Sequence, residues 1–91
     1  MTNSGELIAI NGVVIINDAS ENVVNADSYY VAEDTVIARI EINGDDTKDV
    51  KANYISTHAT AVKGGILITP QSGDYFSAIT LTSGSVVAIL K

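Results

Sequence analysis

The sequence predicts an all-β fold, a single small antiparallel β-sandwich or β-barrel of about seven to eight short strands. Three observations predict this class. Apolar runs rich in Val and Ile recur along the 91-residue chain, turn residues separate them, and no stretch predicts a stable helix. Because a chain of this length builds one hydrophobic core, we expect one β-domain over residues 7–91, preceded by a flexible arm over residues 1–6.

The first predicted strands lie on either side of a turn dipeptide. Asn11-Gly12 favours a tight hairpin turn between the runs 7–10 and 13–16, and one longer, bent strand is the alternative. Neither run alternates cleanly, which predicts burial on two faces or against another chain. The polar residues 17–27 predict a surface loop, because asparagines and valines disfavour a helix there. A short strand follows at residues 28–31.

The clearest predicted strand covers residues 35–42, where apolar and polar side chains alternate. Ile37 is the one exception, because it is an apolar residue on the polar face. Residues 49–56 alternate again after an acidic turn, so these two runs predict an antiparallel hairpin. The remaining runs are separated by Gly64-Gly65, Pro70 and polar turns. The last predicted strands are 66–69, 75–82 and 85–90, with a hairpin turn at Ser83-Gly84.

The charge balance excludes several classes of partner. The chain has a net charge of −6. Nucleic acids and anionic membrane surfaces are bound by Lys and Arg, so we expect no nucleic-acid and no membrane partner. No continuous apolar run is long enough to span a bilayer, and the first residues lack the basic and apolar segments of a signal peptide.

The chain supplies few groups for catalysis. It has no Cys, no Trp and a single histidine, His58. Ser56 and His58 are separated too widely on an extended segment for the hydrogen bond between a nucleophile and its base. We therefore interpret His58 as a solvent-facing residue, assign no catalytic residue and no cofactor, and expect that the chain is not an enzyme.

The acidic turn is the one candidate cation site. Asp45, Asp46 and Asp49 place several oxygens in one small loop, as hard cations prefer. Their spacing does not match the helix-flanked calcium loop, and Lys48 and Lys51 lie in the same patch. We interpret the loop as a solvated turn and assign no metal site, but whether the three aspartates bind a cation stays open.

Tyr29 and Tyr30 are the candidate partner contacts. Consecutive strand residues point to opposite faces, so at least one of the two leaves the core. An exposed tyrosine offers a protein partner a large apolar face and a polar tip at low entropic cost. Tyr75 and Phe76 are instead predicted to fill the core.

The second half of the chain, with the layout KGG…ITP…SGDYFSAITLTSGSVVA, resembles small virion proteins of tailed bacteriophages. It is similar in style to head decoration (cement) proteins, which are short, acidic, cysteine-free and all-β. The resemblance implies a structural protein made in the host cytoplasm and located on the capsid surface of the virion. Its partner would be the major capsid protein, which it would bind and stabilise, commonly as a homotrimer.

The resemblance also implies how the shell is held, through a flexible terminus and one face of the β-domain. The candidate contact residues are then Thr2, Asn3 and Leu7 near the N-terminus, together with Tyr29 and Tyr30. Two alternatives stay open. The first is that the chain is another small virion component, such as a head fibre base, knob or tail adaptor. The second is that it is a non-viral β-domain that binds carbohydrate or a small ligand.

Overall fold

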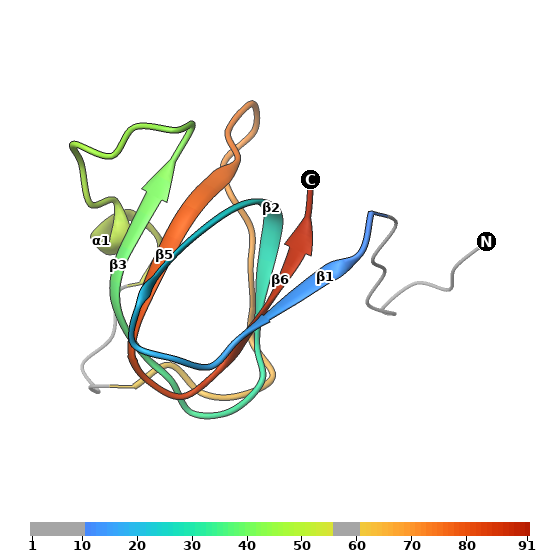
Figure 1. The fold of residues 1–91 in the computed structure, drawn as a ribbon, viewed down its shortest axis with the longest axis vertical. Helices are drawn as coiled ribbons and strands as arrows, with labels where there is room; N and C mark the ends of the chain where they lie inside the picture. Colours follow the sequence, from blue (N-terminus) through green and yellow to red (C-terminus); the bar gives the residue numbers. More distant parts are fainter. Residues whose placement is uncertain (1–10, 56–60) are drawn as a thin grey trace.

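The computed structural model describes residues 11–55 and 61–91, which fold into an antiparallel sheet around one core (Figure 1). The sheet has the strand order β1-β6-β2-β5-β3, and β4 pairs with β2 off this path. The predicted all-β class is therefore confirmed, whereas the predicted strand 7–10 and the N-terminal arm lie outside the described residues. The elements are β1 (Val13–Ile16), β2 (Glu21–Val31), β3 (Val36–Ile42), α1 (Lys51–Tyr54), β4 (Leu67–Ile68), β5 (Phe76–Ser83) and β6 (Val86–Leu90).

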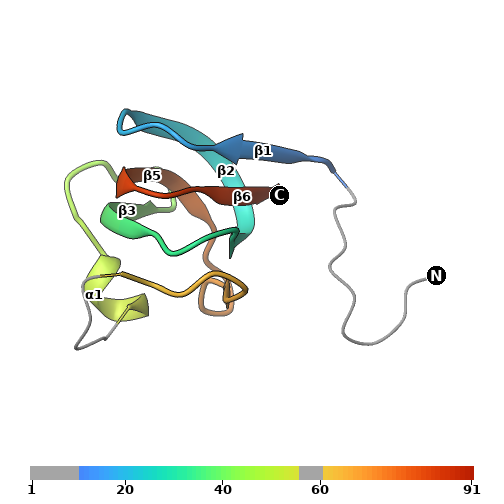
Figure 2. The ribbon, with the colours of Figure 1, turned by 90° about the horizontal axis from the view of Figure 1, so that it is seen from below.

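The long strand β2 folds the sheet into two layers. Its half from Glu21 to Ala26 pairs with β5, and its half from Ala26 to Val31 pairs with β6. Both pairings change register near Ala26, and such irregularities bend a strand. Figures 1 and 2 show β2 curving strongly as it passes between its neighbours. We call β1, β6, β4 and the second half of β2 the first layer, and β3, β5 and the first half of β2 the second layer.

The predicted loop at residues 17–27 is wrong, because β2 already begins at Glu21. Asparagine and aspartate have weak β-propensity, but propensity in a strand depends on the neighbours that a residue meets. Here the backbone from Glu21 to Val23 pairs with Thr80 to Ala78 of β5, far away in the sequence. The long-range pairing thus overrides the local preference.

The predicted strand at residues 49–56 is also wrong, and so is its hairpin with β3. Residues Lys51–Tyr54 form the short helix α1, and β3 pairs with β5 instead. Val50 N donates to Ile40 O at 2.8 Å, while Asp49 Oδ1 accepts from Ile40 N at 3.1 Å. The segment therefore touches β3 at one residue and then turns into α1.

The face assigned to β3 needs a correction at Ile37. The alternation predicts Ile37 on the polar face, but the structure buries it in the core together with Ile40. The β3–β5 register shifts on both sides of Ile37, so the simple alternation of faces is broken there. The strand itself is found where it is predicted, as are β4, β5 and β6 to within one or two residues.

The Ser83-Gly84 turn does not close the predicted hairpin. Strands β5 and β6 each pair with β2, which lies between them in the sheet, so the turn carries the chain from one layer to the other. Gly84 has a φ of +90°, and a Cβ there would lie 2.7 Å from Asp34 O. The buried Thr35 fixes this crossing, because its hydroxyl donates to Glu33 O at 2.7 Å and accepts from Ser85 N at 3.1 Å.

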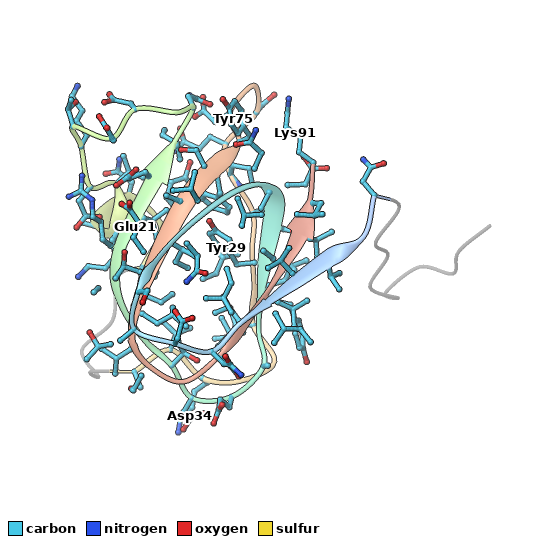
Figure 3. The ribbon with its side chains drawn as sticks, in the orientation of Figure 1. Glu21, Tyr29, Asp34, Tyr75 and Lys91 are labelled. Atoms are coloured by element: carbon cyan, nitrogen blue, oxygen red, sulfur yellow. The ribbon has the colours of Figure 1, made fainter. Side chains whose placement is uncertain are left out.

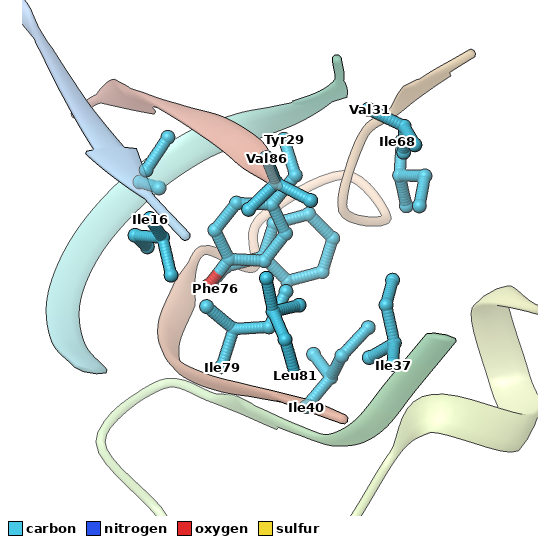
Figure 4. Packing of buried hydrophobic residues seen from close by; sticks show 12 residues of the cluster. Ile16, Tyr29, Val31, Ile37, Ile40, Ile68, Phe76, Ile79, Leu81 and Val86 are labelled. Atoms are coloured by element: carbon cyan, nitrogen blue, oxygen red, sulfur yellow. The ribbon is translucent and has the colours of Figure 1, made fainter. Parts of the chain in front are cut away.

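The core lies between the two layers and is centred on an aromatic pair (Figure 4). The rings of Tyr29 and Phe76 stack with centroids 4.6 Å apart and an interplanar angle of 9°. Tyr54 of α1 meets Phe76 edge-on at 5.2 Å, so the helix packs against this end of the core. The aliphatic residues of the buried cluster are Ile16, Ala26, Val31, Ile37, Ile40, Ile68, Ile79, Leu81, Val86 and Ala88.

The Tyr29 hydroxyl is buried, and no described residue forms a hydrogen bond with it. Burial raises the pKa of Tyr29, and the charge of Glu41 raises it further. Above pH 10 the unfolded tyrosine loses its proton while the folded one keeps it, so stability falls as the pH rises.

We expect Tyr29→Phe to keep the free energy of unfolding at pH 7 or to raise it by up to about 1 kcal/mol, because a buried hydroxyl without a partner is costly. Above pH 10 wild type should lose up to about 1.4 kcal/mol per pH unit relative to this variant. Urea denaturation at several pH values measures both. Tyr30→Phe is the control. Its free energy of unfolding should fall above pH 10 as that of wild type does, because Tyr29 is still present. A loss of more than about 1 kcal/mol in Tyr29→Phe at pH 7 would contradict the prediction.

Within the described part of the chain, no helix is long and apolar enough to cross a membrane.

Candidate interaction surface

The outer surface of the first layer carries a row of apolar side chains. The register pairs Ile15 with Val87, Val87 with Tyr30, and Tyr30 with Leu67. Directly paired residues point to the same side of a sheet, so these four residues form one row across four strands. The two ends of the row are the most open, since Ile15 is 67% and Leu67 is 47% exposed.

A second, parallel row lies beside the first. Val13 pairs with Ile89, which pairs with Ser28, and Val13 is 46% exposed. We call the residues of both rows the outer face: Val13, Ile15, Ser28, Tyr30, Leu67, Val87 and Ile89. None of these side chains carries a charge, although the chain has 11 acidic and 5 basic residues. Ser28 and Ile89 are buried, so the part of the outer face that a partner can reach consists of Val13, Ile15, Tyr30, Val87 and Leu67. Accessible apolar residues that cluster in this way mark an interaction site.

Charged side chains lie on other parts of the domain. Figure 3 shows Asp34 at one end and Tyr75 with Lys91 at the opposite end. Asp34 Oδ1 accepts from Gly64 N at 3.1 Å and Asp34 Oδ2 lies 3.3 Å from Lys63 Nζ, which together lower the pKa of Asp34. Lys91 Nζ lies 4.8 Å from the centroid of the Tyr75 ring. The outer face is thus the apolar side of an otherwise acidic domain.

The structure separates the two tyrosines that the sequence predicts as partner contacts. Tyr30 lies on the outer face and is partly exposed. Tyr29 points to the other side of β2 and is fully buried, so it offers no surface to a partner. The predicted contacts Thr2, Asn3 and Leu7 lie outside the described residues, as do Ser56 and His58.

Sequence reasoning missed the other members of the outer face. The one signal for them is the lack of alternation in residues 13–16, which predicts burial on two faces or against another chain. Both outward residues of this run, Val13 and Ile15, are in fact exposed. Leu67 gave no such signal, because β4 has only two residues.

The acidic turn uses its carboxylates to hold its own backbone. Asp45 Oδ1 accepts from the hydroxyl and from the N–H of Thr47, and these hydrogen bonds lower the pKa of Asp45. Asp49 Oδ1 accepts from Ile40 N at 3.1 Å and from Lys51 N at 2.9 Å. Burial raises the pKa of Asp49, but these hydrogen bonds outweigh it and the net shift is downward. Within residues 11–55 and 61–91, no three His, Asp or Glu side chains converge as metal ligands would.

An open hollow of about 330 Å³ lies beside this turn. One of its polar groups is already engaged, because Asn43 Nδ2 donates to Asp74 Oδ1 at 2.9 Å and Asn43 Oδ1 accepts from Tyr75 N at 3.1 Å. The Asn43 side chain is thus committed to hydrogen bonds within the protein. The lining residues of the hollow are Ile42, Asn43, Asp45, Lys48, Val50 and Asn53.

No family model matches the chain, and comparison with curated proteins and with solved structures yields no match either.

Proposed function

We propose that this chain is a structural, non-enzymatic virion protein of a tailed bacteriophage, a capsid decoration protein that binds and stabilises the outer head shell. The observation that carries the proposal is the uncharged outer face on a chain with a net charge of −6. The resemblance of the second half of the chain to cement proteins supports the same function. The partner is then the major capsid protein.

The outer face suits contact with a flat protein surface. Ile15, Tyr30 and Leu67 can be buried there without removing a charge from water, which would be costly. The acidic residues elsewhere favour solubility before assembly. A shell presents many identical sites, so modest contacts suffice when several copies act together.

Binding to undecorated, expanded capsids of the phage that encodes the chain tests this proposal. We expect saturable, stoichiometric co-sedimentation of the purified protein with these capsids. Leu67→Lys should weaken binding at least about tenfold, because it places a charge in the contact, equivalent to about 1.4 kcal/mol.

Val23→Lys is the matched control, because Val23 is 73% exposed and lies on β2 in the second layer, away from the outer face. It should bind capsids as wild type does. Absence of binding by wild type would reject the decoration function. Equal weakening by the two lysine variants would reject the outer face as the contact.

A further inference from the structure

The chain protects one edge of its sheet. At β3 the outward N–H and C=O of Ile40 are taken by Asp49 Oδ1 and by Val50 N. Arg39 and Glu41 add a salt bridge of 2.8 Å on the same strand. Charged side chains and a covering segment are the usual devices that keep an edge strand from pairing with another molecule.

The opposite edge, β1, lacks these devices. Its sequence VVII contains no charge, proline or glycine, and no other described strand lies on its free side. Leu90 N donates to Gly12 O at 3.0 Å. Because hydrogen-bonded and non-hydrogen-bonded pairs alternate in an antiparallel ladder, the N–H and C=O groups of Val13 and Ile15 point away from β6. An apolar edge strand of this kind is a template for another strand.

We propose that β1 pairs antiparallel with β1 of a second copy of this chain, about a two-fold axis that passes through Val14. In this register Val13 lies opposite the partner's Ile15, and Ile15 lies opposite the partner's Val13. Each of these pairs can exchange two backbone hydrogen bonds, so all the outward groups of both residues are satisfied.

Side-chain alternation selects this register. A shift by one residue would place Val13 and Ile15 opposite residues whose side chains point inward and whose backbone groups point toward β6. A shift by two residues keeps the correct faces but leaves outward backbone groups unpaired. The register centred on Val14 is therefore the one that satisfies both the backbone and the side chains.

A second copy fits the edge of β1, because its own Val13 and Ile15 present the same outward backbone groups in reverse order. The net charge of −6 opposes association of two copies, so their contact has to be free of charged side chains. The β1 edge and the adjoining outer face meet that condition. The pairing is isologous, since the same strand serves on both sides and the contact closes on itself.

Two-fold pairing has a consequence for the shell contact that rests on the proposed function. An axis perpendicular to the sheet leaves both outer faces on the same side, so a dimer presents twice the apolar surface. A sheet edge accepts one strand, which gives a dimer at this contact instead of the trimer that the resemblance to decoration proteins implies. Because four paired residues bury less than the roughly 800 Å² per partner of a stable complex, we expect dissociation upon dilution.

Sedimentation equilibrium over about 1 µM to 1 mM protein tests the pairing. Wild type should approach twice the monomer mass of 9.5 kDa at the upper end. Ile15→Lys should stay monomeric, while Val23→Lys and Leu67→Lys should dimerise as wild type does. A wild type that stays monomeric, a trimer mass, or equal dissociation by Val23→Lys would overturn the proposal.

A single cysteine tests the register, because the chain has no cysteine of its own. Val14→Cys should form a disulfide dimer upon mild oxidation, since two residues directly opposite in a non-hydrogen-bonded pair have suitable Cβ spacing. Val23→Cys, which is more exposed but far from the axis, should cross-link much more slowly. Circular dichroism of both variants confirms that they are folded. A monomeric Val14→Cys, as expected if residues 7–10 of the same chain cover β1, would overturn the pairing.

The two proposals fail separately. If wild type stays monomeric but binds capsids, the pairing alone is wrong. If it dimerises through β1 but does not bind capsids, the decoration function alone is wrong.

Discussion

Gly84→Ala is expected to lower the free energy of unfolding by at least about 3 kcal/mol, a large part of a total of about 5 to 15 kcal/mol. The added Cβ would lie 2.6 Å from Thr35 Cα and 2.7 Å from Asp34 O. Both atoms belong to the backbone just before β3, so neither can rotate away. A φ of +90° adds strain for any residue with a side chain. Urea denaturation followed by circular dichroism measures the loss.

Gly73→Ala separates the steric cost from the backbone cost. Gly73 has nearly the same φ, +88°, but a Cβ there would meet nothing within 4 Å. We expect it to lose only about 1 kcal/mol, the cost of a left-handed conformation without a clash. If the two variants lose the same free energy of unfolding, the close approach of Gly84 to Thr35 does not add to the cost and the prediction is wrong.

Phe76→Ala is expected to cost about 3 to 5 kcal/mol of a total stability of about 5 to 15 kcal/mol. Phe76 is fully buried, stacks on Tyr29 of β2 and receives the edge of Tyr54 from α1. Its removal leaves a cavity between both layers and frees α1 from its main aromatic contact. We expect a lower denaturant midpoint together with a loss of near-ultraviolet tyrosine dichroism.

Phe76→Leu is the control for this prediction. It keeps most of the apolar volume but loses the stacked pair, so it should cost less than about 1.5 kcal/mol. If Phe76→Ala costs no more than Phe76→Leu, the core collapses around the gap and the aromatic pair is not its centre.

The sequence predicted those elements whose signal is local. Strands β3, β5 and β6 are continuous apolar or alternating runs that end at turn residues, and they lie within one or two residues of their predicted positions. The first half of β2 has no such signal, because its glutamate and asparagines become strand residues only when this segment pairs with β5. Residues 49–56 alternate as a strand would, but the Asp49 side chain and the Val50 backbone N–H form hydrogen bonds with Ile40. These outcomes are set by contacts between distant segments.

The candidate surface could be predicted only in part for the same reason. Strand geometry places Tyr29 and Tyr30 on opposite sides, but it does not say which one leaves the core. The structure selects Tyr30 because Tyr29 stacks on Phe76. The row from Ile15 to Leu67 joins four strands whose neighbours and register are fixed by the fold, so no local window of sequence contains it.

The path of β2 has a consequence for synthesis on the ribosome. Its partners β4, β5 and β6 all lie at least 36 positions after its own last residue, Val31. Until β6 has been synthesised, the second half of β2, which carries Tyr29, lacks its partner β6. The sheet can therefore be completed only late, after synthesis of β6, and the net charge of −6 opposes aggregation of chains whose sheet is still open.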